Sequence, residues 1–127
     1  MFEVSVEETF AAGHALRGYK GKCENPHGHN YRVRVVLKGK DLDSIGLLYD
    51  FKDVKQIIAA TVDRLDHKFM NDIPPFDTIN PSAENLARYF YDESVRLLAE
   101  RLPANGVAVK TVTVWETDTT TATYSRD

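Results

Sequence analysis

Two segments in the first third of the chain alternate apolar and polar residues, and this alternation constrains the fold most strongly. Every second residue from Phe2 to His14 lies on one mainly apolar face that ends with the histidine. Residues 27–38 alternate in the same way and begin with His27 and His29 on one face. Because the side chains of a strand point alternately to its two faces, both segments are predicted to be β-strands with one buried face.

A loop of about a dozen residues, 15–26, is expected between the two strands. It contains two glycines and has no regular apolar period, and loops of this length are often functional. It also carries Cys23, the only cysteine of the chain. A single cysteine forms no internal disulfide, and the amino terminus lacks the basic and apolar segments of a secretory signal. These features predict a protein of the reducing cytoplasm.

The middle of the chain has helical periodicity. Apolar residues recur at helical spacing from 54 to 65, after Asp50, which is a good N-cap, and this helix is expected to end near 66–67. A second helix is expected to run to about residue 101. Its cap is either Asn80 or Ser82, with Pro81 tolerated in its first turn.

The last third of the chain returns to strand patterns. After a break at 103–106, residues 107–117 are rich in β-branched side chains, and residues 119–126 are expected to form a shorter strand after a turn. The predicted order is ββααββ. We expect one α+β domain spanning 1–127, with a four-stranded antiparallel sheet and two helices.

Charge and composition exclude some classes of function. No segment approaches the ~18 consecutive apolar residues of a membrane span. The net charge of -3 argues against broad nucleic-acid binding. Residues 15–40 nevertheless hold seven Lys/Arg and one acidic residue. This basic stretch is either a solvated surface or a site for an anionic small molecule, and the sign of the charge alone does not choose between them.

Three histidines are predicted to converge on one metal ion. His27 and His29 share a strand face, and His14 ends the neighbouring strand. A histidine taken singly is more often a packed or surface residue. Three neutral imidazoles with an open fourth position form the arrangement of catalytic zinc, and their joint placement beside a free cysteine favours a metal site.

Cys23 has two chemical interpretations. Nearby cations such as Lys22, or a metal, would favour the thiolate that nucleophilic or general-base chemistry requires. The sulfur could instead be the fourth metal ligand, which would close the site.

Three further polar residues have both structural and functional interpretations. Asp66 and His67 end the first helix. The structural interpretation is an ordinary surface pair, and the functional one is a pair that transfers a proton. Glu116 shares strand parity with Val112 and Val114, so its carboxylate falls on an apolar face. It is either at an exposed strand end or an anchor for a donor-rich heterocycle.

Taken together, these motifs resemble the 6-pyruvoyltetrahydropterin synthase and 6-carboxytetrahydropterin synthase superfamily. The resemblance spans nearly the whole chain and rests on His14 at the end of the first strand, Cys-x-x-x-His-Gly-His at 23–29, LDHKFMND at 65–72, NPSAEN at 80–85 and WET at 115–117. It implies the ββααββ tunnelling fold (T-fold), whose subunits join their sheets into a barrel, commonly a homohexamer made of two trimers.

The resemblance also implies a role for each matching residue. The Zn²⁺ ligands would be His14, His27 and His29; the catalytic residues Cys23, Asp66 and His67; and the pterin anchor Glu116. The substrate would be a pterin triphosphate, for which Arg17, Lys20 and Lys22 are candidate phosphate contacts.

The spacing of the cysteine motif indicates the subgroup. Three residues separate Cys23 from His27, as in the bacterial queuosine-pathway 6-carboxytetrahydropterin synthases, whereas the biopterin-type enzymes commonly have five. The expected enzyme is therefore a lyase that converts 7,8-dihydroneopterin triphosphate to 6-carboxy-5,6,7,8-tetrahydropterin. Two alternatives stay open: a 6-pyruvoyltetrahydropterin synthase, and a nonenzymatic pterin-binding or zinc-storage protein.

Overall fold

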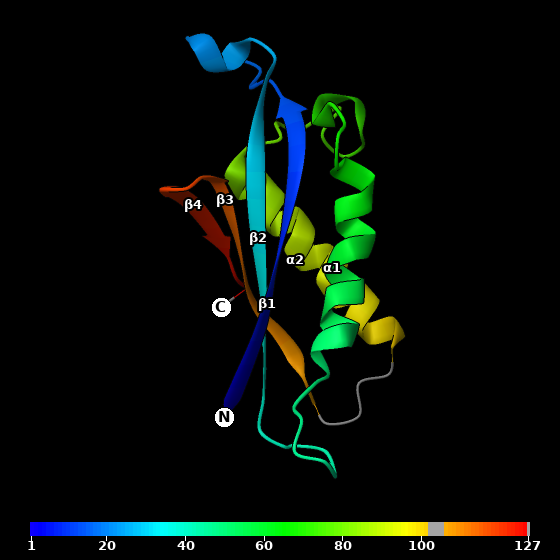
Figure 1. Cartoon of the computed structure of the whole chain (residues 1–127). Coiled ribbons are helices and arrows are strands. Elements are labelled where there is room, and N and C mark those ends of the chain that lie inside the picture. Colours follow the sequence, from blue (N-terminus) through cyan, green and yellow to red (C-terminus); the bar gives the residue numbers. More distant parts are fainter. Residues whose placement is uncertain (102–105, 127) are drawn as a thin grey trace.

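The computed structural model of the protein describes residues 1–101 and 106–126 and has the expected ββααββ order (Figure 1). Two short 3-10 helices accompany the main elements. The order is β1 (Phe2–His14), η1 (Lys22–Glu24), β2 (His27–Gly39), α1 (Phe51–Leu65), η2 (Met70–Asp72), α2 (Ala83–Glu100), β3 (Ala108–Thr117) and β4 (Thr120–Tyr124). The break expected at 103–106 lies, except for Gly106, outside the described residues.

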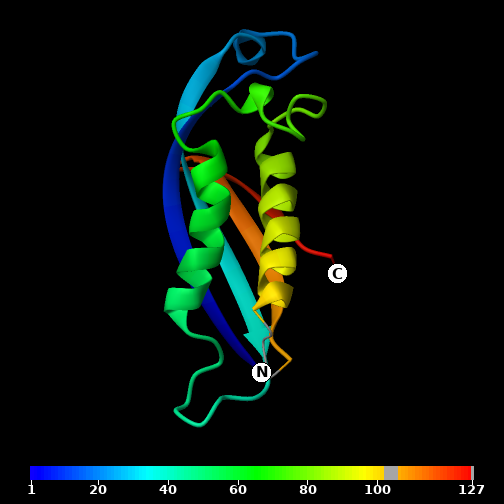
Figure 2. The same cartoon turned by 90° about the vertical axis from the view of Figure 1, so that its right-hand side faces the viewer.

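The four strands form one antiparallel sheet in the order β1-β2-β3-β4. Both helices cover the same face of this sheet, and they lie side by side across it (Figures 1 and 2). The loop between β1 and β2 and the connection between α1 and α2 meet at one end of the molecule (Figure 2). This end contains the first residues of β2, where the histidine motif lies.

The two helices begin at side-chain caps. Asp50 accepts a hydrogen bond from the Lys52 amide at 2.9 Å, as expected. Ser82, rather than Asn80, caps α2 by accepting from the Asn85 amide at 3.1 Å. The expectation that Pro81 lies in the first turn of α2 is therefore wrong. Pro81 precedes the cap, and its carbonyl is bonded elsewhere, to a histidine of β1.

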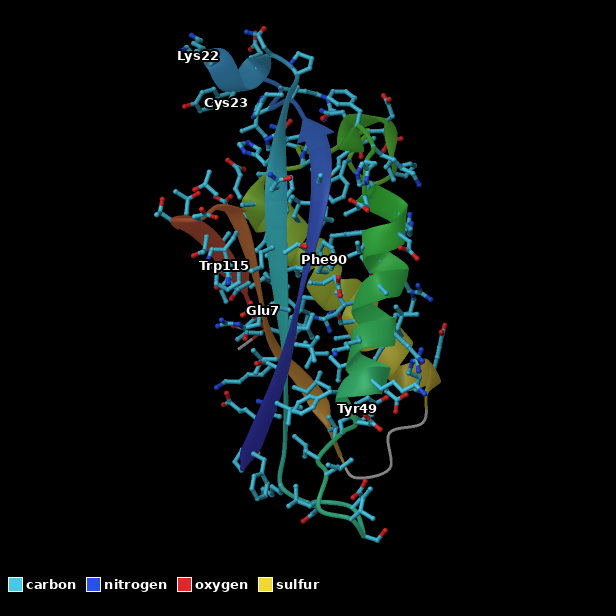
Figure 3. All side chains as sticks on the ribbon, viewed as in Figure 1. Glu7, Lys22, Cys23, Tyr49, Phe90 and Trp115 are labelled. Carbon is cyan, nitrogen blue, oxygen red and sulfur yellow. The ribbon has the colours of Figure 1, made fainter. Side chains whose placement is uncertain are left out.

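The core lies between the sheet and the two helices. Phe10 of β1 stacks on Tyr31 of β2 with ring centroids 5.0 Å apart, and Phe90 of α2 lies 5.7 Å from Phe10. Figure 3 shows Phe90 between the two layers. Burying such aromatic side chains supplies much of the free energy that holds the layers together. None of the described helices has the length and apolar character needed to cross a membrane.

The opposite sheet face is polar and explains part of the basic stretch. Glu7 accepts hydrogen bonds from Arg32 at 3.2 Å and from Arg34 at 2.7 Å. Both guanidinium groups also lie over the Trp115 ring, at 4.0 and 5.0 Å from its centroid. These two arginines are therefore engaged by Glu7 and Trp115 on the exposed face of the sheet.

Replacing Phe90 with alanine should lower the free energy of unfolding by about 3–5 kcal/mol, because it removes a fully buried ring that packs between α2 and the sheet. Urea denaturation followed by far-ultraviolet circular dichroism measures the loss. Lys55→Ala, on the exposed side of α1, is the control and should change stability by less than about 0.5 kcal/mol. Equal stabilities for the two variants would contradict the assigned core.

Candidate metal centre and active site

The register of β1 and β2 brings the three histidines together. His14 pairs with His27 across the strands, and His29 lies opposite Ala12. Because positions 27 and 29 share a strand face, the imidazoles gather at one end of the sheet. One ring nitrogen of each histidine lies within 4.8 Å of those of the other two, so the group could hold a metal ion. The predicted convergence is confirmed.

Two backbone carbonyls orient the first two rings. Nδ1 of His14 lies 2.7 Å from the Pro81 carbonyl oxygen, and Nδ1 of His27 lies 2.7 Å from that of Asn25. A carbonyl only accepts hydrogen bonds, so Nδ1 carries a hydrogen in both rings, and in the neutral form of each ring the lone pair is on Nε2. The two Nε2 atoms face each other at 2.9 Å. Such lone pairs repel unless a proton or a metal ion lies between them.

The third ring completes the case for a cation. Nε2 of His29 is buried and has no hydrogen-bond partner among the described residues. It lies 3.6 Å from a carboxylate oxygen of Glu116, beyond hydrogen-bond distance. A buried polar atom without a partner is costly, and coordination to a metal ion would remove that cost. The three imidazoles therefore fit a divalent ion.

A buried tyrosine supports His14 from behind. The Tyr31 hydroxyl lies 3.1 Å from Nδ1 of His14, and the Tyr31 ring is fixed by its stack on Phe10. Burial raises the pKa of Tyr31, so the phenol remains protonated. Burial also lowers the pKa of His14, which favours the neutral imidazole that a metal requires.

Asp66 and His67 form a direct pair at the end of α1. Nδ1 of His67 lies 3.0 Å from one Asp66 oxygen, and the other oxygen accepts a hydrogen bond from the Ala11 amide at 2.9 Å. That amide, and then the His67 contact, lower the pKa of Asp66. His67 has φ 59°, an uncommon left-handed conformation for a residue other than glycine. Its side chain is 81% exposed, so the ring is available to a ligand.

Cys23 lies apart from the three histidines. It is half-buried on η1, beyond the ends of β1 and β2 (Figure 3). Among the described residues, the group that could hold a metal comprises the histidines alone. The structure therefore does not bring the sulfur into the ligand group, and the interpretation of Cys23 as a fourth ligand gains no support from it.

Glu116 and His67 line different hollows of about 470 Å³ each. Glu116 borders one between β4 and the start of α2, which is lined by Leu16, residues 82–84 and residues 120–123. His67 borders another, lined by residues 11–13, 28–30 and 67–69. Within one chain, these two expected site residues do not share a cavity.

Sequence reasoning missed the residues that support the site. Pro81 and Tyr31 orient His14, and two asparagines, Asn71 and Asn80, bind the backbone that follows it. The two asparagines stand in the motifs at 65–72 and 80–85, which was a signal that these motifs do more than present Asp66 and His67. The carbonyl of Pro81 has no sequence signal.

The comparisons with known proteins agree with this geometry. The 6-pyruvoyl tetrahydropterin synthase family matches residues 3–127. The 6-carboxy-5,6,7,8-tetrahydropterin synthase of Haemophilus influenzae is 30% identical over 98% of this chain and 99% of its own. The human 6-pyruvoyl tetrahydrobiopterin synthase is 38% identical over 96% of this chain and 90% of its own. A solved structure of Caenorhabditis elegans 6-pyruvoyl tetrahydropterin synthase superposes with a TM-score of 0.84 at 28% identity, covering 100% of this chain and 98% of that one.

Replacing Tyr31 with phenylalanine should weaken the binding of a divalent ion, tested with Zn²⁺, by about tenfold, because it removes the hydroxyl beside Nδ1 of His14 and leaves the ring stack in place. Isothermal titration calorimetry measures the dissociation constant. Tyr19→Phe, at an exposed position of the β1–β2 loop, is the matched control and should bind as the unmodified protein does. Identical affinities for all three proteins would show that the hydroxyl does not support the site.

Proposed function

Because the chain belongs to the 6-pyruvoyl tetrahydropterin synthase family, we propose that it is a zinc-dependent 6-carboxytetrahydropterin synthase of queuosine biosynthesis. It would convert 7,8-dihydroneopterin triphosphate and one water molecule to 6-carboxy-5,6,7,8-tetrahydropterin, acetaldehyde and triphosphate. The convergence of three imidazoles at the end of β1 and β2 carries this proposal. A site of three nitrogen ligands and an open fourth position is the arrangement of catalytic zinc.

Each proposed site residue has a separate role in the reaction. A divalent ion bound by His14, His27 and His29 would polarise the side-chain hydroxyls of the substrate. The Cys23 thiolate would remove a proton from the substrate side chain, and His67 would transfer a second proton, held in orientation by Asp66. Glu116 would accept hydrogen bonds from the pterin amino and ring N–H groups and so orient the heterocycle.

The triphosphate would contact the β1–β2 loop. Lys20 and Lys22 are exposed on this loop and can reach an anion. Arg17 is a weaker candidate than its charge suggests, because its guanidinium already donates to the carbonyls of Phe76 and Ile79 at 2.7 and 3.3 Å.

A 6-pyruvoyl synthase is the second candidate, favoured by the 38% identity with the human relative. The spacing of Cys23 and His27 supports the carboxy enzyme, as does the near-complete coverage of the Haemophilus influenzae relative. The two reactions differ in the fate of the side chain, because only the carboxy enzyme releases acetaldehyde.

We propose that the protein is a single cytoplasmic domain that assembles into a hexamer of two trimers. The outer strands of the sheet, β1 and β4, have open edges, and closing these edges against other copies removes an aggregation liability. Assembly would also explain why His67 and Glu116 line separate hollows. One copy would supply Cys23 and Glu116 to a site, and a neighbouring copy would supply His67.

Replacing Cys23 with alanine should reduce turnover of 7,8-dihydroneopterin triphosphate by about 10² to 10⁴, because it removes the proposed base. Zinc content should be unchanged, whereas His27→Ala should lose both zinc and turnover. Mass spectrometry of the products and an acetaldehyde assay measure the reaction of the unmodified protein. Full activity of the Cys23→Ala variant would contradict the role of the thiol, and a three-carbon product would identify the pyruvoyl enzyme.

Mixing inactive variants tests the shared site. Cys23→Ala and His67→Ala should each be inactive, yet hexamers reassembled from an equal mixture should regain activity, with roughly a quarter of the sites intact if subunits mix randomly. Turnover before and after reassembly is the measurement. A mixture that stays as inactive as its components would mean that one chain supplies both residues.

A further inference from the structure

Two asparagine side chains hold the backbone that leads from His14 into the β1–β2 loop. Oδ1 of Asn71 accepts from the Ala15 amide, and its Nδ2 donates to the Ala15 carbonyl, both at 2.9 Å. Asn80 binds Arg17 in the same double arrangement, again at 2.9 Å for each bond. Both backbone groups of residues 15 and 17 are thereby paired, as they would be in a β-ladder.

Only an amide side chain of this length can make both bonds. An amide has a donor and an acceptor side by side, whereas an ionised aspartate of the same shape only accepts. An aspartate at position 71 or 80 would keep the bond to the backbone N–H and place a second oxygen against the backbone carbonyl. The donor half of each pair is therefore specific to asparagine.

The segment that the two asparagines clamp, residues 15–17, is hydrogen-bonded to the cysteine. Leu16, which lies between the two clamped positions, donates its amide hydrogen to the Cys23 carbonyl at 2.8 Å. Residues 17–22 are all exposed, so apolar packing does little to fix this part of the loop. The position of Cys23 therefore depends on hydrogen bonds, and the bond from Leu16 ties it to the clamped segment.

We propose that Asn71 and Asn80 are positioning residues that set the place of Cys23 relative to the three histidines. This inference deepens the proposed function, because it gives the thiol a fixed position from which to act. The two amides act through Leu16, and among the described residues neither amide is hydrogen-bonded to a histidine or to the sulfur.

The connection between α1 and α2 that carries the two asparagines is itself held by further hydrogen bonds. The Asn80 carbonyl accepts from the Asn85 side chain at 2.9 Å, which links it to the first turn of α2. The Arg17 side chain lies back along the connection between α1 and α2, on the Phe76 and Ile79 carbonyls. The same connection carries His67 near its start and Pro81 near its end. If the loop were released from the two asparagines, the thiol would therefore move relative to His67 and to the Pro81 carbonyl, which stay in place.

Asn71→Asp and Asn80→Asp in the zinc-loaded, full-length protein test this proposal. In each variant, hydrogen exchange followed by mass spectrometry should show that the amides of residues 15–17 and 23–25 exchange about tenfold faster than in the unmodified protein. Each variant loses a hydrogen-bond donor and places a carboxylate oxygen against a backbone carbonyl. Turnover number should fall by about the same factor, with the KM for 7,8-dihydroneopterin triphosphate and the zinc content unchanged. Gln56→Glu, an amide-to-carboxylate change on the exposed side of α1, controls for the added negative charge.

The outcomes separate this inference from the proposed function. Unchanged exchange at residues 15–25, or a fall in turnover that follows loss of zinc, overturns the positioning role. If the unmodified protein does not convert the pterin, the proposed function fails, and the exchange data alone decide whether the amides hold the loop. Should the aspartate variants not fold, Asn71→Ala and Asn80→Ala remove the amides without adding charge. The unmodified protein gives a further test, since equal exchange at residues 15–17 and 18–22 would also overturn the proposal.

Discussion

The hydrogen bonds from the two Nδ1 atoms to backbone carbonyls are the interaction on which the site depends. Strand register places His14 opposite His27, but register alone leaves each ring free to turn. The carbonyls of Pro81 and Asn25 fix both rings so that their Nε2 atoms face each other. Nε2 of His29, which has no hydrogen-bond partner in the described part of the chain, lies beside them, so the three nitrogens are already placed to hold a cation.

The connection between the two helices gives the site most of its remaining geometry. Residues 66–81 are hydrogen-bonded to residues 11–17 at several successive points, from the Ala11 amide to the Arg17 side chain. This long contact lets a surface connection act as a rigid support, although loops of this kind are usually mobile. It holds the ring of His14, the exposed His67 and the start of the cysteine loop in one frame.

Much of the fold and the convergence of the three histidines could be predicted from the sequence because both follow from local periodicity. Alternation in β1 and β2 placed His14, His27 and His29 on one face, and helical spacing after Asp50 located α1. Other features depend on contacts between distant segments. Ser82 rather than Asn80 caps α2 because the amide of Asn80 is engaged by Arg17, 63 residues away. The direct contact of Asp66 with His67 accompanies a left-handed backbone that residue type does not reveal.

Zinc K-edge X-ray absorption of the zinc-loaded protein tests the central claim most directly, because it counts the atoms bound to the ion. We expect three nitrogen ligands at about 2.0–2.1 Å and one light oxygen ligand, with no sulfur, in agreement with three imidazoles and an open position. A sulfur at about 2.3 Å would mean that Cys23 closes the site, and it would contradict a catalytic role for the metal.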